Sequence, residues 1–357
     1  MIEIQGAREQ VNRKKLPSGI SGLSRRIHGL GMQLGIWIEP EMVNEDSSLY
    51  RCHPDWCLRI PGRLPNVERG QLVLDMSREE VREYLFQQIS QVLEEGEIDY
   101  VKWDMNRNLS DVWSGALPKE RQGEASHRYV LGLYALMERF TSAYPDILWE
   151  GCSGGGGRFD AGILYYMPQI WCSDNTDGVE RLQIQYGTSF GYPVSTMGSH
   201  VSASSNLQTG RRTPLETRAC TAMAGSFGYE LDVGKLGEEE REAIKEQIRE
   251  YRQFYSLIHQ GDYYRLTDAG RDREFTAWEF AREDGSEALV CVVTLRARSN
   301  PAFVRLRVKG LLEDGKYQIN EETKEYDGSA LMYGGILLPA VRQDYQSTRF
   351  WIRQIKK

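Results

Sequence analysis

Two aspartates in this chain follow apolar runs, at points where a strand is expected to end. Asp104 stands in KWDMNR and Asp174 stands in WCSDNTD. One further apolar run, DILWEGC, separates them, so alternate strands of a parallel sheet would bring both carboxylates to the same edge. Such a pair can supply one nucleophile and one general acid/base. On the residues alone, three other carboxylates compete for these roles: Glu39, Glu41 and Glu150.

Polar side chains alternate around the first of these aspartates. Lys102, Asp104 and Asn106 occupy every second position in IDYVKWDMNR, residues 98–107. Successive side chains of a strand point to opposite faces, so an extended chain would place these three on one face. A neighbouring Lys102 would lower the pKa of Asp104. A solvated strand end without a function accounts for this stretch about as well when it is considered alone.

The elements that must position these residues are six apolar runs separated by helical patterns. The expected strands cover residues 32–43, 98–107, 146–152, 167–175, 196–204 and 222–232. Strands that alternate with helices and carry polar residues at one end are typical of a (β/α)₈ TIM barrel. Six strands are two fewer than a closed barrel needs. The sequence therefore predicts an α/β fold with an incomplete TIM barrel, in which a retaining glycosidase could hold its two carboxyl groups about 5–5.5 Å apart.

Helices are expected between these strands and disappear near the C-terminus. Helical spacing covers residues 19–30, 77–95, 129–145 and 238–258, and Ser77 to Glu80 has the S-x-x-E form of a capping box. From about Asp262 the pattern changes to short alternating runs such as FTAWEF, ALVCVVTL and FVRLRV. The sequence thus predicts a catalytic barrel domain at 1–261 and a small all-β sandwich domain at 262–357.

The composition excludes several classes of protein. A net charge of -7 without a long Lys/Arg run argues against binding to nucleic acid. No apolar segment approaches the roughly 20 residues of a membrane span, and the first ten residues lack an apolar signal core, so we expect a cytoplasmic protein. The six cysteines are scattered and are expected to be reduced thiols. Cys52, His53 and Cys57 lack the partners that a zinc site needs, and no metal or other cofactor is expected.

Four consecutive glycines follow the strand expected at 146–152. The run from Gly154 to Gly157 lacks the GK[ST] ending of a phosphate loop and a convincing GxGxxG register. Glycines at a strand end also let the backbone approach a ligand closely. The barrel pattern favours this second interpretation.

Taken together, these motifs resemble the catalytic and C-terminal parts of the glycoside hydrolase family 36 α-galactosidases, from about residue 11 to the end. The matching stretches are GIWIEPEMV, HPDWCL, QLVLDMSREEVREY, YVKWDMNR, EGCSGGGGRFD, WCSDNTD, ERLQIQYGTS and MGSHVSA. The resemblance implies that Asp104 is the nucleophile and Asp174 the general acid/base. It also implies that the galactose pocket includes Trp37, Arg69, Lys102, Asn106, Cys152 and Gly154. The implied reaction is hydrolysis of terminal α-D-galactosyl residues of oligosaccharides such as raffinose or melibiose, by double displacement.

The chain differs from this family at its N-terminal end. Family members carry an N-terminal β-sandwich domain and two further barrel strands, the second with an Asp-Asp-Gly-Trp motif that binds galactose hydroxyls. Neither part is recognisable here, so we expect a truncated barrel with impaired activity. The expected protein partner is either a complementing N-terminal chain or another copy of this chain in a homo-oligomer. The alternative functions are an α-N-acetylgalactosaminidase, a transglycosylase, and a noncatalytic fragment or carbohydrate-binding remnant.

Overall fold

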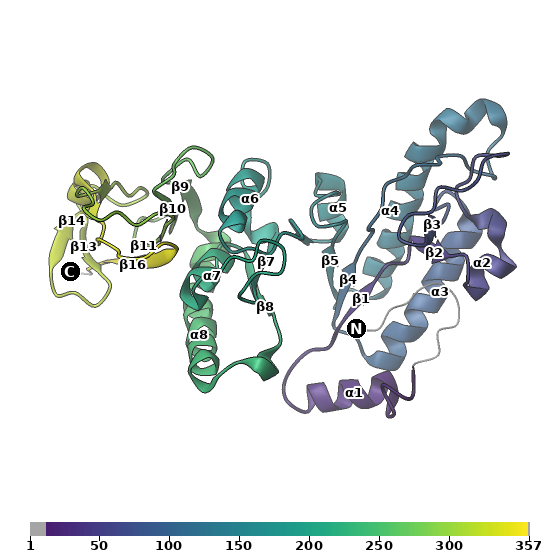
Figure 1. Cartoon of the computed structure of the whole chain (residues 1–357), viewed down its shortest axis with the longest axis horizontal. Coiled ribbons are helices and arrows are strands. Elements are labelled where there is room, and N and C mark those ends of the chain that lie inside the picture. Colours follow the sequence, from purple (N-terminus) through teal and green to yellow (C-terminus); the bar gives the residue numbers. More distant parts are fainter. Residues whose placement is uncertain (1–11, 356–357) are drawn as a thin grey trace. The chain divides into compact units, whose positions relative to one another are not determined.

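A computed structural model describes residues 12–355, which divide into two compact units (Figure 1). One unit runs to Trp171 and the other starts at Cys172. The domain limits at 1–261 and 262–357 follow fold type rather than compactness and stay a prediction. None of the helices within residues 12–355 is long and apolar enough to cross a membrane.

The first unit is built on four parallel strands. They are hydrogen-bonded in the order β1 (Gly35–Ile38), β4 (Tyr100–Trp103), β5 (Leu148–Gly151) and β6 (Gln169–Trp171). A separate antiparallel pair joins β2 (Met42–Asn44) to β3 (Gln71–Val73). The register pairs Trp37 with Lys102, and Lys102 with Glu150, across neighbouring strands. Residues from three strands therefore lie at one level of the sheet.

Helices connect these strands and bury their apolar stripes against them. The helices of this unit are α1 (Gly19–His28), α2 (Ser48–Cys52), η1 (Pro54–Trp56), α3 (Glu79–Gly96), η2 (Lys119–Glu124), α4 (Ala125–Ala143) and α5 (Ala161–Tyr166). Val81, Leu85 and Ile89 repeat at helical spacing on α3 and are buried. Trp103 of β4 is completely buried and packs edge-on against Phe140 of α4. This packing fixes the end of β4, where the first catalytic candidate follows.

The second unit begins with two parallel strands and three helices. β7 (Met197–Ser202) pairs with β8 (Ser226–Glu230). The helical elements around them are α6 (Glu180–Thr188), η3 (Val194–Thr196), α7 (Leu215–Ala222), η4 (Val233–Lys235) and α8 (Glu238–Gln260). With the four strands of the first unit, the described residues contain the six parallel strands that the sequence predicts.

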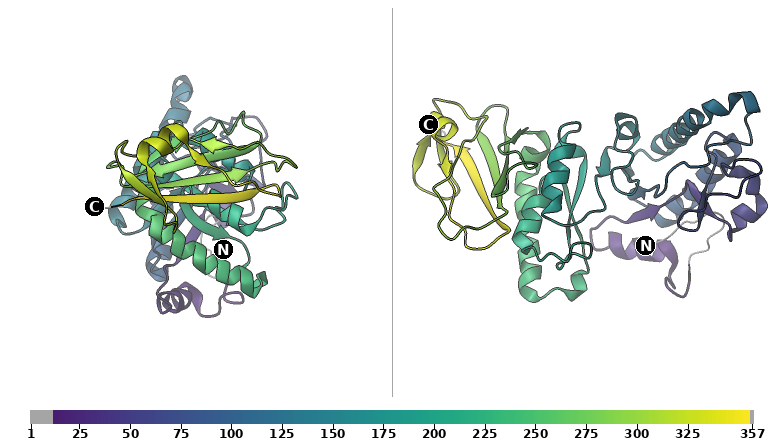
Figure 2. Two further views of the ribbon diagram at one scale, coloured as in Figure 1. Left: turned by 90° about the vertical axis from the view of Figure 1, so that its left-hand side faces the viewer. Right: turned by 45° about the horizontal axis from the view of Figure 1, so that its top comes forward.

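The remainder of the second unit is an antiparallel sheet with a small second layer. Its strand order is β14 (Glu325–Asp327), β13 (Lys316–Ile319), β16 (Gln346–Gln354), β11 (Glu287–Thr294), β10 (Phe275–Ala281) and β9 (Asp262–Arg265). The second layer holds the pair β12 (Arg305–Leu306) and β15 (Ile336–Leu337), with η5 (Ala330–Gly334) between them in sequence. Helix α8 lies beside the large sheet (Figure 2), and its Phe254 packs edge-on against Trp351.

Two local predictions are wrong. The stretch expected as one strand at 32–43 holds two: β1 starts at Gly35 and ends ahead of Pro40, where proline is expected to end the ladder, and the chain then turns into the separate strand β2. The capping box at Ser77 does not form, because Arg78 is the N-cap of α3. The Ser77 hydroxyl donates instead to Asp75 Oδ1 at 2.5 Å. Asp75 lies outside the S-x-x-E motif and provides the Ser77 hydroxyl with an acceptor that the motif does not include.

Glu279 of β10 is a fully buried acid in the core of the C-terminal sheet. It lies between Ala277 and Ala281 on the strand face that forms this core. Burial raises its pKa from the usual 4.5 to about 8, although the Lys309 amide, which donates to Oε2 at 2.8 Å, acts in the opposite direction. The folded protein therefore keeps a proton that the unfolded chain releases near pH 4.5.

We expect the free energy of unfolding to fall as the pH rises through this range, because the folded state binds the extra proton. One proton changes the stability by about 1.4 kcal/mol per pH unit, which amounts to about 2 kcal/mol between about pH 6 and about pH 8. Glu279→Gln should remove this dependence. Urea denaturation at both pH values measures it, with the exposed Glu283→Gln as the matched control. Equal pH dependence in wild type and Glu279→Gln would contradict the assignment.

Candidate active site

Asp104 is the first residue after β4 and is held on both sides of its backbone. Its amide donates to Ile38 O of β1 at 2.9 Å, and Trp103 O accepts from the Cys152 amide at 2.8 Å. The Asp104 side chain is only 5% exposed. Its Oδ2 accepts from Trp37 Nε1 at 3.1 Å, and its Oδ1 accepts from the Met105 amide at 2.8 Å. Two donors therefore fix the carboxylate in place.

Asn106 connects three parts of the site. Its Nδ2 donates to Asp104 Oδ2 at 2.8 Å and to Glu39 Oε1 at 2.5 Å. Its Oδ1 accepts from the Gly154 amide at 2.9 Å. The alternation expected for Asp104 and Asn106 thus brings the two side chains together, even though β4 ends at Trp103. The side-chain amide of Asn106 therefore fixes the Asp104 carboxylate relative to the glycine loop.

Glu39 belongs to the site, although the sequence suggests it only as a competing carboxylate. It is 2% exposed, and Arg69 Nη1 lies 3.4 Å from its Oε1. Burial raises the pKa of Glu39, while Asn106 and Arg69 act in the opposite direction. Its alternation with Trp37 on β1 is the signal that could have placed it beside Asp104. Because Asn106 and Arg69 both contact its Oε1, Glu39 supports these two side chains and does not face substrate directly.

Lys102 pairs with a different carboxylate from the one expected. Its Nζ lies 3.2 Å from Glu150 Oε1 and 4.9 Å from the ring centre of Trp171. Glu150 is completely buried and also accepts from Tyr100 and Gln169. Glu150 therefore fixes the lysine from inside the sheet and is too enclosed to attack a substrate.

The glycine loop after β5 brings Cys152 and Gly154 to the same region. Burial, followed by the nearby Asp104 charge, raises the pKa of the buried Cys152 thiol well above its usual range, so it stays neutral. Gly154 has φ +54°, a conformation that side chains rarely adopt, and this leaves its amide directed at Asn106. Of the expected site residues, Trp37, Asn106 and Cys152 lie next to the Asp104 carboxylate, while Gly154 contacts Asn106 and Arg69 contacts Glu39. The Lys102 charge lies against Glu150 instead.

Asp174 lies in the second unit, in the segment between Cys172 and α6, and its side chain is exposed. The backbone that leaves Asp174 is held by the loop that follows β7: Asp174 O accepts from Gln208 Nε2 at 3.0 Å. Nothing in the spacing of the sequence indicates this loop.

Asn106→Asp should lower by about 10²-fold the rate of any reaction in which Asp104 takes part, the scale of loss for a misplaced catalytic group. The substitution places a third carboxylate between Glu39 and Asp104 and replaces a donor by an acceptor, so the three negative charges repel one another. Protonation of this cluster relieves the repulsion, so the acidic limb of the pH–rate profile should move to higher pH. The exposed Asn108→Asp, two residues away, is the control. An unchanged acidic limb would show that Asn106 does not tune this carboxylate.

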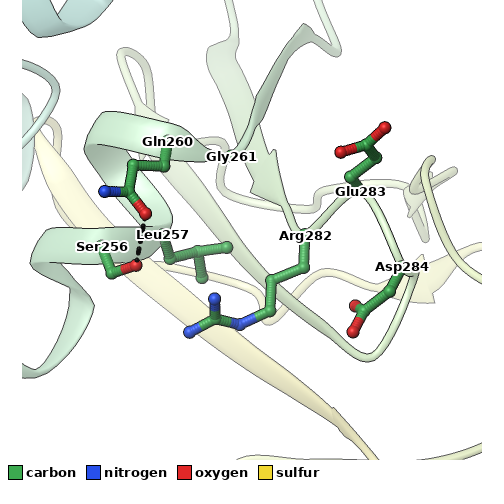
Figure 3. Close-up of a pocket in the computed structure, with 7 residues that line it drawn as sticks. All are labelled: Ser256, Leu257, Gln260, Gly261, Arg282, Glu283 and Asp284. Carbon is green, nitrogen blue, oxygen red and sulfur yellow. Dashed lines mark hydrogen bonds between the residues drawn. The ribbon is translucent and has the colours of Figure 1, made fainter.

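A polar cleft of about 500 Å³ lies elsewhere, between the end of α8 and the turn that joins β10 to β11 (Figure 3). Ser256 donates to Gln260 Oε1 at 3.1 Å on one side, and Arg282 lies opposite. Arg282 pairs with Glu287 at 2.7 Å. None of the expected site residues lines this cleft.

Two family models match the chain. The model of melibiase matches residues 7–261, and that of the glycosyl hydrolase family 36 C-terminal domain matches residues 275–352. The chain is 53% identical over 348 residues to the bifunctional alpha-galactosidase/sucrose kinase AgaSK of Mediterraneibacter gnavus, an alignment that covers 98% of this chain and 36% of that protein. It is 50% identical to alpha-galactosidase AgaA of Geobacillus stearothermophilus, with 97% of this chain and 47% of that protein covered. The chain thus spans about half or less of the length of these relatives.

Solved structures agree with these matches. The crystal structure of AgaA superimposes with a TM-score of 0.95 at 49% identity, over 98% of this chain and 49% of that one. A second structure of AgaA, in complex with raffinose, gives a TM-score of 0.95 at 48% identity, over 99% and 51%. The predicted fold class, an incomplete TIM barrel followed by a small all-β sandwich, is confirmed. The chain belongs to the glycoside hydrolase family 36 α-galactosidases.

Proposed function

We propose that this chain carries the catalytic pair of a retaining α-galactosidase that hydrolyses terminal α-D-galactosyl residues of oligosaccharides such as raffinose and melibiose. The observation that carries the proposal is the buried Asp104 carboxylate, held by Trp37 Nε1 and Asn106 Nδ2 at the end of β4. Relatives at 50–53% identity are alpha-galactosidases, and one was solved with raffinose.

In this mechanism Asp104 attacks the anomeric carbon while Asp174 gives its proton to the leaving oxygen. The bond from the anomeric carbon to the leaving oxygen breaks, and a β-galactosyl ester of Asp104 forms. Asp174 then takes a proton from water, which attacks the ester and releases α-galactose with retained configuration. The Trp37 ring suits the apolar face of the sugar, while Arg69 and Lys102 supply donors for its hydroxyls. Asn106 holds the Asp104 carboxylate beside the sugar.

The partners of the chain are part of the proposal. Within residues 12–355, β1 pairs with β4 and no strand is paired along its other edge. A closed barrel of this fold has eight strands, and the described residues contain six parallel ones. We propose that full activity needs two more strands, from a second chain or from sequence beyond these 357 residues, and that the α-galactosidase works in the cytoplasm. Self-association into a homo-oligomer is the other partner proposal, and light scattering after gel filtration measures it.

The test is hydrolysis of raffinose and of p-nitrophenyl α-D-galactoside, followed by NMR to identify the anomer released first. The chain is assayed alone and together with the N-terminal half of AgaA. Release of α-galactose by the chain, alone or with the added half, supports the proposal, and activity that requires the added half supports the need for further strands. Binding of galactose without hydrolysis in both assays would favour the carbohydrate-binding remnant.

Two related activities are separated in the same assays. Faster hydrolysis of p-nitrophenyl N-acetyl-α-D-galactosaminide would assign the chain as an α-N-acetylgalactosaminidase. Longer oligosaccharides formed from raffinose would indicate a transglycosylase. The glycine loop from Cys152 to Gly157 is the segment where a 2-acetamido group would have to be accommodated.

A further inference from the structure

A short loop after β7, residues 206–211, holds the backbone of the segment that contains Asp174. The side-chain amide of Gln208 spans two peptide groups of that segment. Its Nε2 donates to Asp174 O at 3.0 Å, and its Oε1 accepts from the Thr176 amide at 3.2 Å. A single side chain therefore fixes the direction in which the chain leaves Asp174.

Asn206 gives the loop its shape and adds a second connection. It is 6% exposed, and its Oδ1 accepts from the amides of Gln208 at 2.9 Å and Thr209 at 3.0 Å. Its Nδ2 donates to Thr176 Oγ1 at 3.1 Å. Asn206 holds the backbone amide of Gln208. The Gln208 side chain therefore extends from a part of the backbone that is fixed.

Two further residues of the loop hold the next turn of the same segment. Arg211 Nη1 lies 2.5 Å from Asp177 Oδ1, and the Thr209 hydroxyl donates to Asp177 Oδ2. Asp177 is 1% exposed, and it also accepts from the Val179 amide at 2.8 Å at the start of α6. The 206–211 loop is thus joined to residues 174–177 at three successive points, and Gln208 is the one at Asp174.

We propose that Gln208 is a positioning residue for Asp174, and that it sets the efficiency of proton transfer to the leaving group. The inference rests on the proposed function, in which Asp174 is the general acid/base. Gln208 contacts the main chain of Asp174, so it acts by orienting that residue. A general acid must lie within hydrogen-bond reach of the oxygen it protonates, and a displacement of about 1 Å can cost about 10²-fold in rate.

The leaving group provides a readout that a purely structural role would not change. The sugar released from raffinose is a poor leaving group that needs a proton, whereas p-nitrophenolate leaves without one. Gln208→Ala should therefore lower kcat/KM for raffinose by about 10- to 100-fold and change kcat/KM for p-nitrophenyl α-D-galactoside by less than about 3-fold. Asp174→Asn should show the same selectivity more strongly.

Gln260→Ala is the matched control, since Gln260 is an exposed glutamine of the same unit with one side-chain contact, to Ser256 (Figure 3). It should leave both substrates unaffected. Equal losses on the two substrates in Gln208→Ala would overturn the inference. Failure of the wild type on both substrates, even with the N-terminal half of AgaA added, would count against the proposed function alone.

Hydrogen exchange tests the contact without any turnover. The Thr176 amide, which donates to Gln208, should exchange faster in Gln208→Ala than in the wild type or Gln260→Ala. Unchanged exchange at Thr176 would overturn the inference whether or not the chain is active.

Discussion

Asp104→Gly is expected to lower kcat/KM for p-nitrophenyl α-D-galactoside by on the order of 10⁴-fold, the scale on which removal of a covalent nucleophile reduces other enzymes. This corresponds to about 5 kcal/mol of lost transition-state stabilisation. The loss is large because neither Glu39 nor Glu150 is placed to replace it. Glu39 and Glu150 are both buried and are already bound to Asn106 and Lys102 respectively.

Azide should restore part of the activity of Asp104→Gly, because the shortened side chain leaves room on the β face of the sugar. Azide then forms the bond to the anomeric carbon that Asp104 would form, the aryl oxide leaves, and the product is β-galactosyl azide. NMR identifies its anomeric configuration. The exposed Asp146→Asn is the control and should behave as wild type. Release of α-galactosyl azide, or labelling of a residue other than Asp104 by a covalent galactosyl inactivator, would contradict the assignment of the nucleophile.

The parts of this fold that the sequence predicts correctly are those in which one physical pattern dominates. All six parallel strands lie within the runs that the sequence predicts as strands, although β8 has no buried residue. The contact of Asp104 with Asn106 follows from strand alternation, and the pattern holds three residues beyond the end of β4. Pro40 ends the ladder of β1 as expected, but the run at 32–43 holds a second strand, β2, after it.

The parts that it misses depend on contacts between residues distant in sequence. Lys102 is close in sequence to Asp104, yet its charge lies against Glu150 of the neighbouring strand. Gln208 lies 34 positions from Asp174 in a polar loop without periodicity, so no spacing rule connects them. The role of Glu39 could have been inferred from its alternation with Trp37, but its burial and its contact with Arg69 required coordinates.

Glu41 lies at the centre of a buried network that connects the segments of the site. It is completely buried, and Trp103 Nε1 donates to its Oε1 at 2.8 Å. Tyr129 OH donates to its Oε2 at 2.5 Å, and Arg158 Nη1 contacts both oxygens at 2.8 and 3.0 Å. These partners come from β4, α4 and the end of the glycine loop. Burial by itself lowers the pKa of Arg158, but Glu41 and Tyr129 together raise it, so the guanidinium stays charged.

Glu41→Leu is therefore expected to lower the free energy of unfolding by about 3–5 kcal/mol, since it leaves the Arg158 charge without its buried partner. Urea denaturation measures the change. Glu124→Gln is the control, because Glu124 also accepts from two arginines, Arg121 and Arg128, but lies at the surface. Such a pair is screened by water, so the control should change the stability little.

A double-mutant cycle separates the pair from the rest of the network. If most of the loss in Glu41→Leu comes from the stranded charge, then adding Arg158→Met should recover a large part of it, because replacement of both members of a buried ion pair costs less than removal of one. The hydrogen bonds from Trp103 and Tyr129 remain lost in the double variant, so recovery should be incomplete. Additive losses in the cycle would mean that Arg158 is solvated independently of Glu41. The glycine loop would then be held on this side of the site by the contacts of Gly154 with Asn106, of Ser153 with Met105 O and of Cys152 with Trp103 O.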